Sequence, residues 1–170
     1  MFGVGFFLLT FIQACAQSPI TNDKIPGDLK ITLNRTICYG SCPAYSLTIA
    51  ASGKVTFEGR SFTGTIGKAE GKIDQKAIKE LTGEFIKADF FNLKDNYSRE
   101  KDGCREVWTD HPSETISITA NAKNKTVSHY FGCKNVTGNA LQRITKLGER
   151  IDELVKSDKW VKGWKPENDK

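Results

Sequence analysis

The chain has 170 residues, of which 38% are hydrophobic and 26% are charged, and its formal net charge at pH 7 is +5. This length and composition fit one globular domain with a modest core, and they exclude a collagen, a coiled coil, a multi-span membrane protein and a fully disordered chain. Lys and Arg residues are interleaved with Asp and Glu instead of clustering with aromatic residues, so we expect no nucleic-acid partner.

Residues 1–16 have the pattern of an export signal peptide. Their apolar run ends at Ile12 and is too short to span a bilayer, which takes about 20 apolar residues. Residues 12–15 resemble a bacterial lipobox, in which Cys15 carries lipid, whereas an A-x-A site over residues 14–16 would release a secreted soluble protein. We favour the lipoprotein, exported and membrane-anchored on the periplasmic or outer face, over the secreted alternative.

Three further segments follow the signal peptide. Residues 17–28 are polar and contain two prolines, which predicts a tether. Residues 29–158 are expected to form a single α+β domain. Residues 159–170 are expected to be a charged tail, in which Trp160 and Trp164 could cover an edge of the core.

Apolar and polar residues alternate in the first half of the domain, which is typical of half-buried strands. Strands are predicted over residues 29–34, 45–49 and 55–57, with a more irregular one in the glycine-rich stretch 59–73. Asp74 is predicted to cap a helix whose apolar residues recur at helical spacing up to Ala88.

The second half of the domain begins with residues 94–110, the most loop-like stretch. Two further strands are predicted around Ile116 and Val127, and a stripe of apolar residues between Ala140 and Leu154 predicts the last helix. The order β-β-β(β)-α-β-β-α indicates an α+β fold in which an antiparallel sheet is covered by two helices.

The chain has five cysteines, and four remain if Cys15 carries lipid or is removed. An even number in an exported domain predicts disulfides, with three connectivities open. Cys38 and Cys42 flank a tight turn, and Cys104 and Cys133 flank a predicted hairpin, so we predict the pairs Cys38–Cys42 and Cys104–Cys133. The second link would contribute about 3 to 4 kcal/mol by closing a long loop.

Three stretches together resemble a known bacterial family. They are the CYGSCP segment at residues 38–43 with the strand that follows it, ADFFNLKDNY at residues 88–97, and Thr109-Asp110 ahead of the Ile116 strand. The chain is similar here to domain-of-unknown-function family 6438, whose members are exported domains often carried by lipoproteins. The resemblance covers about residues 29–156 and implies domain boundaries and export, but no activity.

The Cys38-x-x-x-Cys42-Pro sequence is the sharpest candidate for chemistry. Two thiolates at this spacing could bind copper or zinc, with His111 or His129 completing the ligand set, or could form a thiol-redox pair. A structural disulfide is the interpretation we favour, because a strand follows the motif where the similar motif of Sco-type copper-delivery proteins precedes a helix.

The sequence contains no catalytic constellation, so we expect no enzyme, no catalytic residues and no cofactor. We expect a non-catalytic binding or scaffolding module of the cell envelope, whose partners are the membrane, through the lipid anchor, and an unidentified envelope protein or polymer. Tyr97 and Trp108, in the loop-like stretch 94–110 next to Cys104, form the candidate contact surface. A copper-binding or thiol-redox protein that uses Cys38 and Cys42 is the alternative.

Overall fold

The computed structural model describes residues 20–21 and 24–163, and within these residues the chain forms a seven-stranded sheet, a two-stranded sheet and three α-helices. The strands are β1 Lys30–Arg35, β2 Ala44–Ala50, β3 Lys54–Ser61, β4 Gly67–Lys72, β5 Asn96–Tyr97, β6 Glu106–Val107, β7 Ser113–Ala120, β8 Lys123–Tyr130 and β9 Cys133–Lys134. The helices are α1 Gln75–Lys87, α2 Ala140–Val155 and α3 Asp158–Val161, and two single 3-10 turns cover Phe90–Asn92 and Glu100–Asp102.

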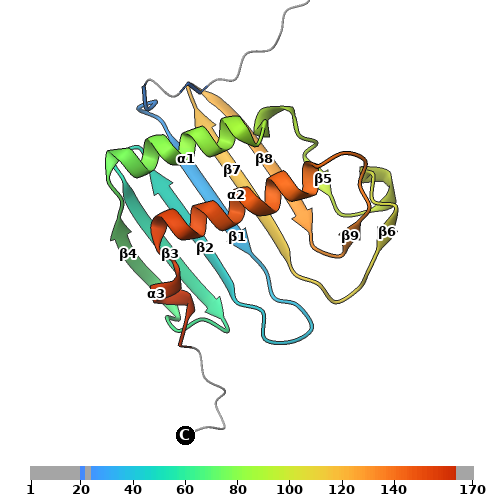
Figure 1. The fold of residues 1–170 in the computed structure, drawn as a ribbon. Coiled ribbons are helices and arrows are strands. Elements are labelled where there is room, and N and C mark those ends of the chain that lie inside the picture. The colour runs from blue at the N-terminus through green and yellow to red at the C-terminus, as the bar shows by residue number, and fades with distance from the viewer. Residues whose placement is uncertain (1–19, 22–23, 164–170) are drawn as a thin grey trace, which may run out of the picture.

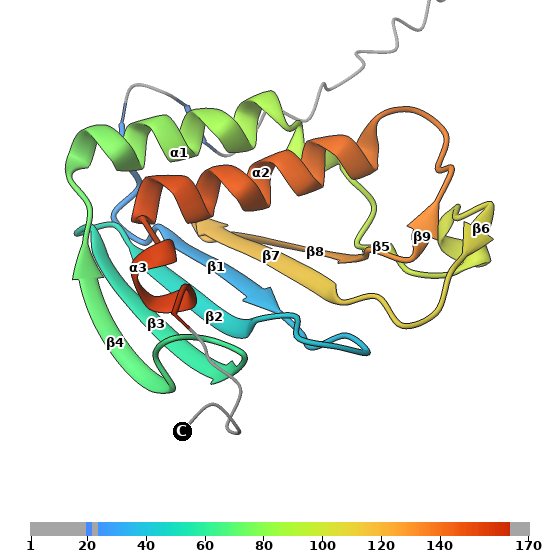
Figure 2. The ribbon, with the colours of Figure 1, turned by 60° about the horizontal axis from the view of Figure 1, so that its bottom comes forward.

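The large sheet has the strand order β4-β3-β2-β1-β7-β8-β5, and β6 pairs with β9 in the small one. Helices α1 and α2 lie side by side on one face of the large sheet (Figures 1 and 2). The expected α+β fold, a sheet covered by two helices, is thereby confirmed. The sheet is not antiparallel throughout, because the short strand β5 runs parallel to β8, with Tyr97 opposite His129.

The core lies between the sheet and the two helices. Alternate residues of the central strands point toward the helices and are almost completely buried, among them Ile31, Leu33, Leu47, Phe57, Ile116 and Val127. The opposite face carries short polar side chains, and one row across five strands consists of Thr56, Thr48, Thr32, Ser117 and Thr126. An antiparallel sheet covered on one side only has this division of apolar and polar faces.

Each long helix places its apolar stripe on the sheet. Asp74 caps α1 as predicted, and its carboxylate accepts a hydrogen bond of 2.7 Å from the backbone N–H of Ala77. The buried side chains of α1 include Leu81 and Phe85, and those of α2 include Ile144 and Ile151. None of the helices within residues 20–21 and 24–163 is long and apolar enough to cross a membrane.

The segment expected to be a tether contributes to the fold. Ile20 is 2% exposed and belongs to the hydrophobic core. Asp28 accepts hydrogen bonds of 2.8 and 2.7 Å from the backbone N–H groups of Asn121 and Ala122, in the turn between β7 and β8. These two bonds, the one from Ala122 first, lower the pKa of Asp28. Two residues of the expected tether over residues 17–28, Ile20 and Asp28, therefore contact the folded domain.

The folded part also continues beyond residue 158. Helix α3 lies in the segment expected to be a tail, and its Trp160 stacks on Phe57 with ring centroids 5.1 Å apart. This side chain covers the edge of the core, as predicted, because Gly71 of β4 leaves room for the indole ring. Trp164, the signal peptide at residues 1–16 and Cys15 lie outside the described residues.

Replacement of Leu33 by alanine should lower the free energy of unfolding by about 2 to 5 kcal/mol, because Leu33 is fully buried and its removal leaves a cavity in the core. Thr32→Ala, on the opposite face of the same strand, is the matched control and should change stability by about 0.5 kcal/mol. Urea unfolding followed by circular dichroism measures both. Equal losses for the two variants would contradict the layer assignment.

Candidate functional site

The first loop of the candidate site joins β1 to β2 over residues 36–43. A disulfide connects Cys38 to Cys42 with a Cα–Cα distance of 5.5 Å, and Gly40, at φ +143°, makes the tight turn between them. The backbone therefore closes into a small ring, from which Tyr39 projects with 90% of its surface exposed. This pairing matches the prediction from the sequence.

The second loop, residues 104–112, is held by the other predicted disulfide. Cys104 and Cys133 are bonded, with a Cα–Cα distance of 5.2 Å, and are only 3% and 1% exposed. Next to this link β6 pairs with β9, and the backbone N–H of Trp108 donates a 2.8 Å hydrogen bond to the carbonyl of Gly132. Residues 104–112 are thus fastened to the end of β8 instead of extending freely into solvent.

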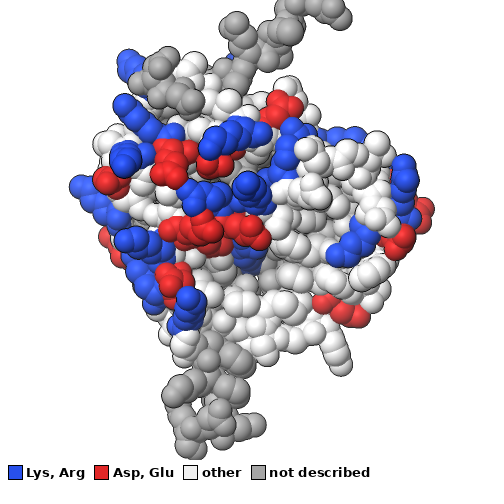
Figure 3. Space-filling model, in the orientation of Figure 1, with Lys and Arg blue, Asp and Glu red and all other residues white. Residues whose placement is uncertain are grey.

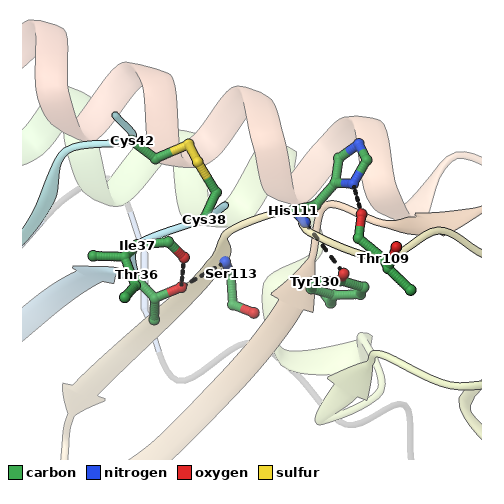
Figure 4. The surroundings of a disulfide bond; sticks show 8 residues. All are labelled: Thr36, Ile37, Cys38, Cys42, Thr109, His111, Ser113 and Tyr130. Atoms are coloured by element: carbon green, nitrogen blue, oxygen red, sulfur yellow. Dashed lines mark hydrogen bonds between the residues drawn. A yellow bond between two sulfur atoms is a disulfide. The ribbon is translucent and has the colours of Figure 1, made fainter. Parts of the chain in front are cut away.

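Hydrogen bonds connect the two loops to each other. The backbone N–H of Tyr39 donates to the carbonyl of Asp110 at 3.2 Å, and that of Thr36 donates to the carbonyl of Ser113 at 3.0 Å. In return, the N–H of Ser113 donates to the hydroxyl of Thr36 at 2.8 Å (Figure 4). The two disulfide-held loops therefore form one continuous surface at this end of the molecule.

Trp108 is exposed but held in place on this surface. Its indole N–H donates to the Glu106 carboxylate at 3.3 Å, and the ammonium of Lys134 lies 5.1 Å from its ring centroid. The backbone below it is fixed by Tyr130, whose hydroxyl donates a 2.8 Å hydrogen bond to the Trp108 carbonyl and accepts one of 3.3 Å from the N–H of His111. A large aromatic side chain is thus presented in a defined position.

Exposed apolar side chains gather on these two loops. Of the five large hydrophobic residues that are exposed within residues 20–21 and 24–163, four lie here: Ile37, Tyr39, Val107 and Trp108. We call these four residues the braced-loop face. The fifth, Ile66, lies elsewhere and directly precedes the edge strand β4.

Tyr97 does not belong to this surface, which corrects part of the contact surface expected from the sequence. Its side chain is 3% exposed, and its hydroxyl accepts a 3.1 Å hydrogen bond from the backbone N–H of Lys94. The stretch expected to be a loop contains β5, which adds Tyr97 to the edge of the sheet. Tyr39, which the sequence pattern alone does not single out, lies on this surface because it projects from the small ring closed by Cys38 and Cys42.

Neither histidine forms a described hydrogen bond or ion pair with Cys38 or Cys42. His111 bonds through Nδ1 to the carbonyl of Thr109 at 2.7 Å, whereas His129 is buried beside Glu114. Within the described part of the chain no three Cys, His, Asp or Glu residues are grouped so that they could hold a metal ion. The alternative ligand set of Cys38, Cys42, His111 and His129 is not assembled here.

A buried charge network lies beneath the loops, between the sheet and α2. Arg35 is 3.3 Å from the fully buried carboxylate of Glu114 and 3.1 Å from that of Asp152. The hydroxyl of Tyr45 donates to Asp152 at 2.9 Å. Gly148 of α2 faces Glu114, and a Cβ at this position would collide with the carboxylate. We call Arg35, Tyr45, Glu114 and Asp152 the buried charge network.

The alternation of residues in the strands indicates this network. Arg35 lies two residues after the inward-facing Leu33, and Glu114 lies two residues before the inward-facing Ile116. The register also places Arg35 and Glu114 opposite each other. Strand alternation alone therefore points both charged side chains into the core. A buried carboxylate of this kind is stable only when it is paired and hydrogen-bonded.

The chain matches a family model over most of its length. The match covers residues 29–155 and the family is described as a domain of unknown function (DUF6438). The chain belongs to this family, as the CYGSCP segment and its companions suggested. A search among curated proteins finds no match.

Alkaline pH should destabilise the protein through Tyr45. Burial, together with the neighbouring Asp152 carboxylate, raises the pKa of Tyr45 above its ordinary value of 10.0. The stabilisation that depends on this proton is complete below about pH 10 and is lost as the pH rises further, by about 1.4 kcal/mol per pH unit, because the unfolded chain ionises first. Urea titrations between pH 8 and 11 measure the slope.

In that experiment Tyr45→Phe should flatten the alkaline slope, although it lowers stability at neutral pH by about 1 kcal/mol through the lost hydrogen bond. Tyr39→Phe, at an exposed position, should leave the slope unchanged. A slope that is the same in all three proteins would show that Tyr45 ionises in the folded state as freely as in the unfolded state.

The two disulfides should differ in their reactivity toward a dithiol reductant. Cys38 and Cys42 are partly exposed, whereas Cys104 and Cys133 are buried, so reduction of the folded protein should open the Cys38–Cys42 bond first. Alkylation followed by peptide mapping identifies the freed thiols. Labelling of Cys104 or Cys133 before Cys38, in protein that remains folded, would contradict this order.

Proposed function

We propose that this member of the family is a non-catalytic binding module of the bacterial cell envelope, which docks a protein partner on the braced-loop face. One observation carries the proposal: four of the five exposed large hydrophobic residues in the described part of the chain gather on two adjoining loops, each held by a disulfide. Scattered exposed apolar residues need no explanation, but a cluster on a fixed surface is typical of an interaction site.

The fixed geometry favours binding energetically. Trp and Tyr are enriched among the residues that contribute most to protein interfaces. Ordering loops and side chains on association costs free energy, and a surface that is ordered beforehand avoids part of this cost. The hydrogen bond between Tyr39 and Asp110 and the contacts around Trp108 supply that order in the free protein.

The chemistry of the face favours a protein over a polysaccharide. The indole N–H of Trp108 is already bonded to Glu106, and the ring also interacts with Lys134. These groups are therefore less free to bond to sugar hydroxyls or to stack on a sugar ring. Ile37 and Val107 add aliphatic surface, which suits apolar side chains of a partner protein.

The proposed location is the exported, membrane-anchored one that the N-terminal sequence suggests, with lipid on Cys15. Two disulfides support an oxidising compartment, because such bonds are rare in proteins of the cytosol. A secreted form that begins after residue 16 would expose the same face, so the docking proposal holds for both.

Thiol exchange at Cys38–Cys42 is the second candidate function. The partial exposure of Cys38 and Cys42 favours it, since accessible disulfides are more readily reduced than buried ones. In this candidate, a dithiol partner would be oxidised while the Cys38–Cys42 bond is reduced to two thiols. This thiol-exchange role requires that the Cys38–Cys42 bond is reduced before the Cys104–Cys133 bond.

The docking proposal is tested by affinity capture from an envelope extract of the source bacterium, followed by binding measurements with the purified captured partner. The double variant Tyr39→Ala/Trp108→Ala should bind that partner at least about tenfold more weakly, because it removes both aromatic residues from the face. Ile66→Ala, which removes an exposed apolar side chain elsewhere, is the control and should bind like the wild type.

Equal binding of the partner by the double variant and the wild type would overturn the docking site. Digestion of the extract with protease before capture distinguishes the partner classes. Capture that is lost after digestion supports a protein, whereas material that is still captured through Tyr39 and Trp108 after digestion would show that the partner is a polymer and that the proposed protein partner is wrong.

A further inference from the structure

A pocket of about 480 Å³ lies between the end of β8, β9 and the N-terminal half of α2. The residues that line it include His129, Phe131 and Leu141. Three charged residues also line it: Lys134, Lys146 and Glu149. The surface over this part of the molecule, on the right in Figure 3, carries few charged side chains compared with the surface over α1 and the C-terminal half of α2. The pocket is large enough for a small organic ligand.

His129 is the one buried polar residue among those that line this pocket. It is 3% exposed, and its Nδ1 lies 3.4 Å from Oε1 of the fully buried Glu114. Because a carboxylate only accepts hydrogen bonds, Nδ1 carries the proton that faces Glu114. No hydrogen bond to Nε2 is formed within residues 20–21 and 24–163, so this nitrogen remains available to a ligand.

The group that suits Nε2 is a hydroxyl. A neutral imidazole would accept a hydrogen bond at Nε2, and a protonated one would donate. A hydroxyl can act in either direction, whereas a carbonyl oxygen or an ammonium group fits only one state of the ring. Glu114, which is itself held by Arg35, fixes the orientation of His129 before any ligand enters.

The other residues that line the pocket suit a ligand with an aromatic ring and an acidic group. Phe131 packs against His129 with ring centroids 4.7 Å apart, and Leu141 supplies an aliphatic wall. Lys134 and Lys146 contribute two positive charges against one negative charge from Glu149. Lys146 forms no ion pair with the described part of the chain, so a ligand carboxylate would not have to displace a protein partner from it.

We propose that this pocket binds a small aromatic hydroxy acid. Its hydroxyl would bond to Nε2 of His129, its ring would lie against Phe131 and Leu141, and its carboxylate would be attracted by Lys134 and Lys146. The pocket shares Lys134 with the surroundings of Trp108, but none of the four residues of the braced-loop face lines it, so either proposal can fail without the other.

The chain has only two histidines, which makes proton NMR of the imidazole rings a direct test. Titration with 4-hydroxyphenylacetate should shift the His129 ring resonance to saturation at millimolar ligand or below, while that of His111 stays in place. Phenylacetate, which lacks the hydroxyl, and tyramine, which replaces the carboxylate by an ammonium group, should each bind at least about tenfold more weakly.

Two variants locate the site. His129→Gln should weaken binding of 4-hydroxyphenylacetate at least about tenfold, measured by calorimetry, whereas His111→Gln should bind like the wild type. Since His129→Gln could disturb the fold through Glu114, Leu141→Trp, which fills the pocket from its wall, serves as a second variant and should also abolish the His129 shift. An unmoved His129 resonance, equal binding of phenylacetate, or full binding by Leu141→Trp would each overturn the proposal.

Discussion

The ion pair between Arg35 and Glu114 joins β1 to β7 at the point where the loops of the candidate site leave the sheet. Arg35 ends β1, Glu114 lies near the start of β7, and Asp152 belongs to α2, so one guanidinium links the sheet to the helical layer. Removing one partner of such a buried pair costs about 3 to 5 kcal/mol, although well-packed apolar residues could replace the whole group without loss of stability. The network is therefore better understood as a device that fixes positions than as a source of stability.

Its members stand at the bases of the loops that form the candidate site. Arg35 directly precedes the loop with Cys38 and Cys42, and Tyr45 follows it, and both bond to Asp152. Glu114 follows the loop that carries Trp108, and it also contacts His129, which precedes the segment with Cys133. One buried cluster thus sets the positions at which these chain segments leave the sheet, and the two disulfides fix the loops farther out.

Much of this architecture is encoded in local patterns. Alternation places Leu33 and Ile116 in the core, and the carboxylate of Asp74 marks the start of α1, because both effects depend only on neighbours in sequence. Tyr97 could not be placed in this way, since it is buried by a two-residue strand that pairs in parallel with β8, a contact between distant segments. The pocket at His129 also depends on such contacts, because α2 and β8 meet only in the folded chain.

The location of the disulfides bears on which end of the molecule is functional. At the edge of the sheet near β4, Trp160 stacks on Phe57, and backbone hydrogen bonds from Gly64 and Thr65 also hold α3. In the two disulfide-held loops, Ile37, Tyr39, Val107 and Trp108 point outward, so these loops gain little from burial. A disulfide can keep a loop ordered without burying its side chains. The covalent links lie in or next to the loops whose apolar side chains are exposed, and the proposed docking function requires these side chains to be both exposed and fixed.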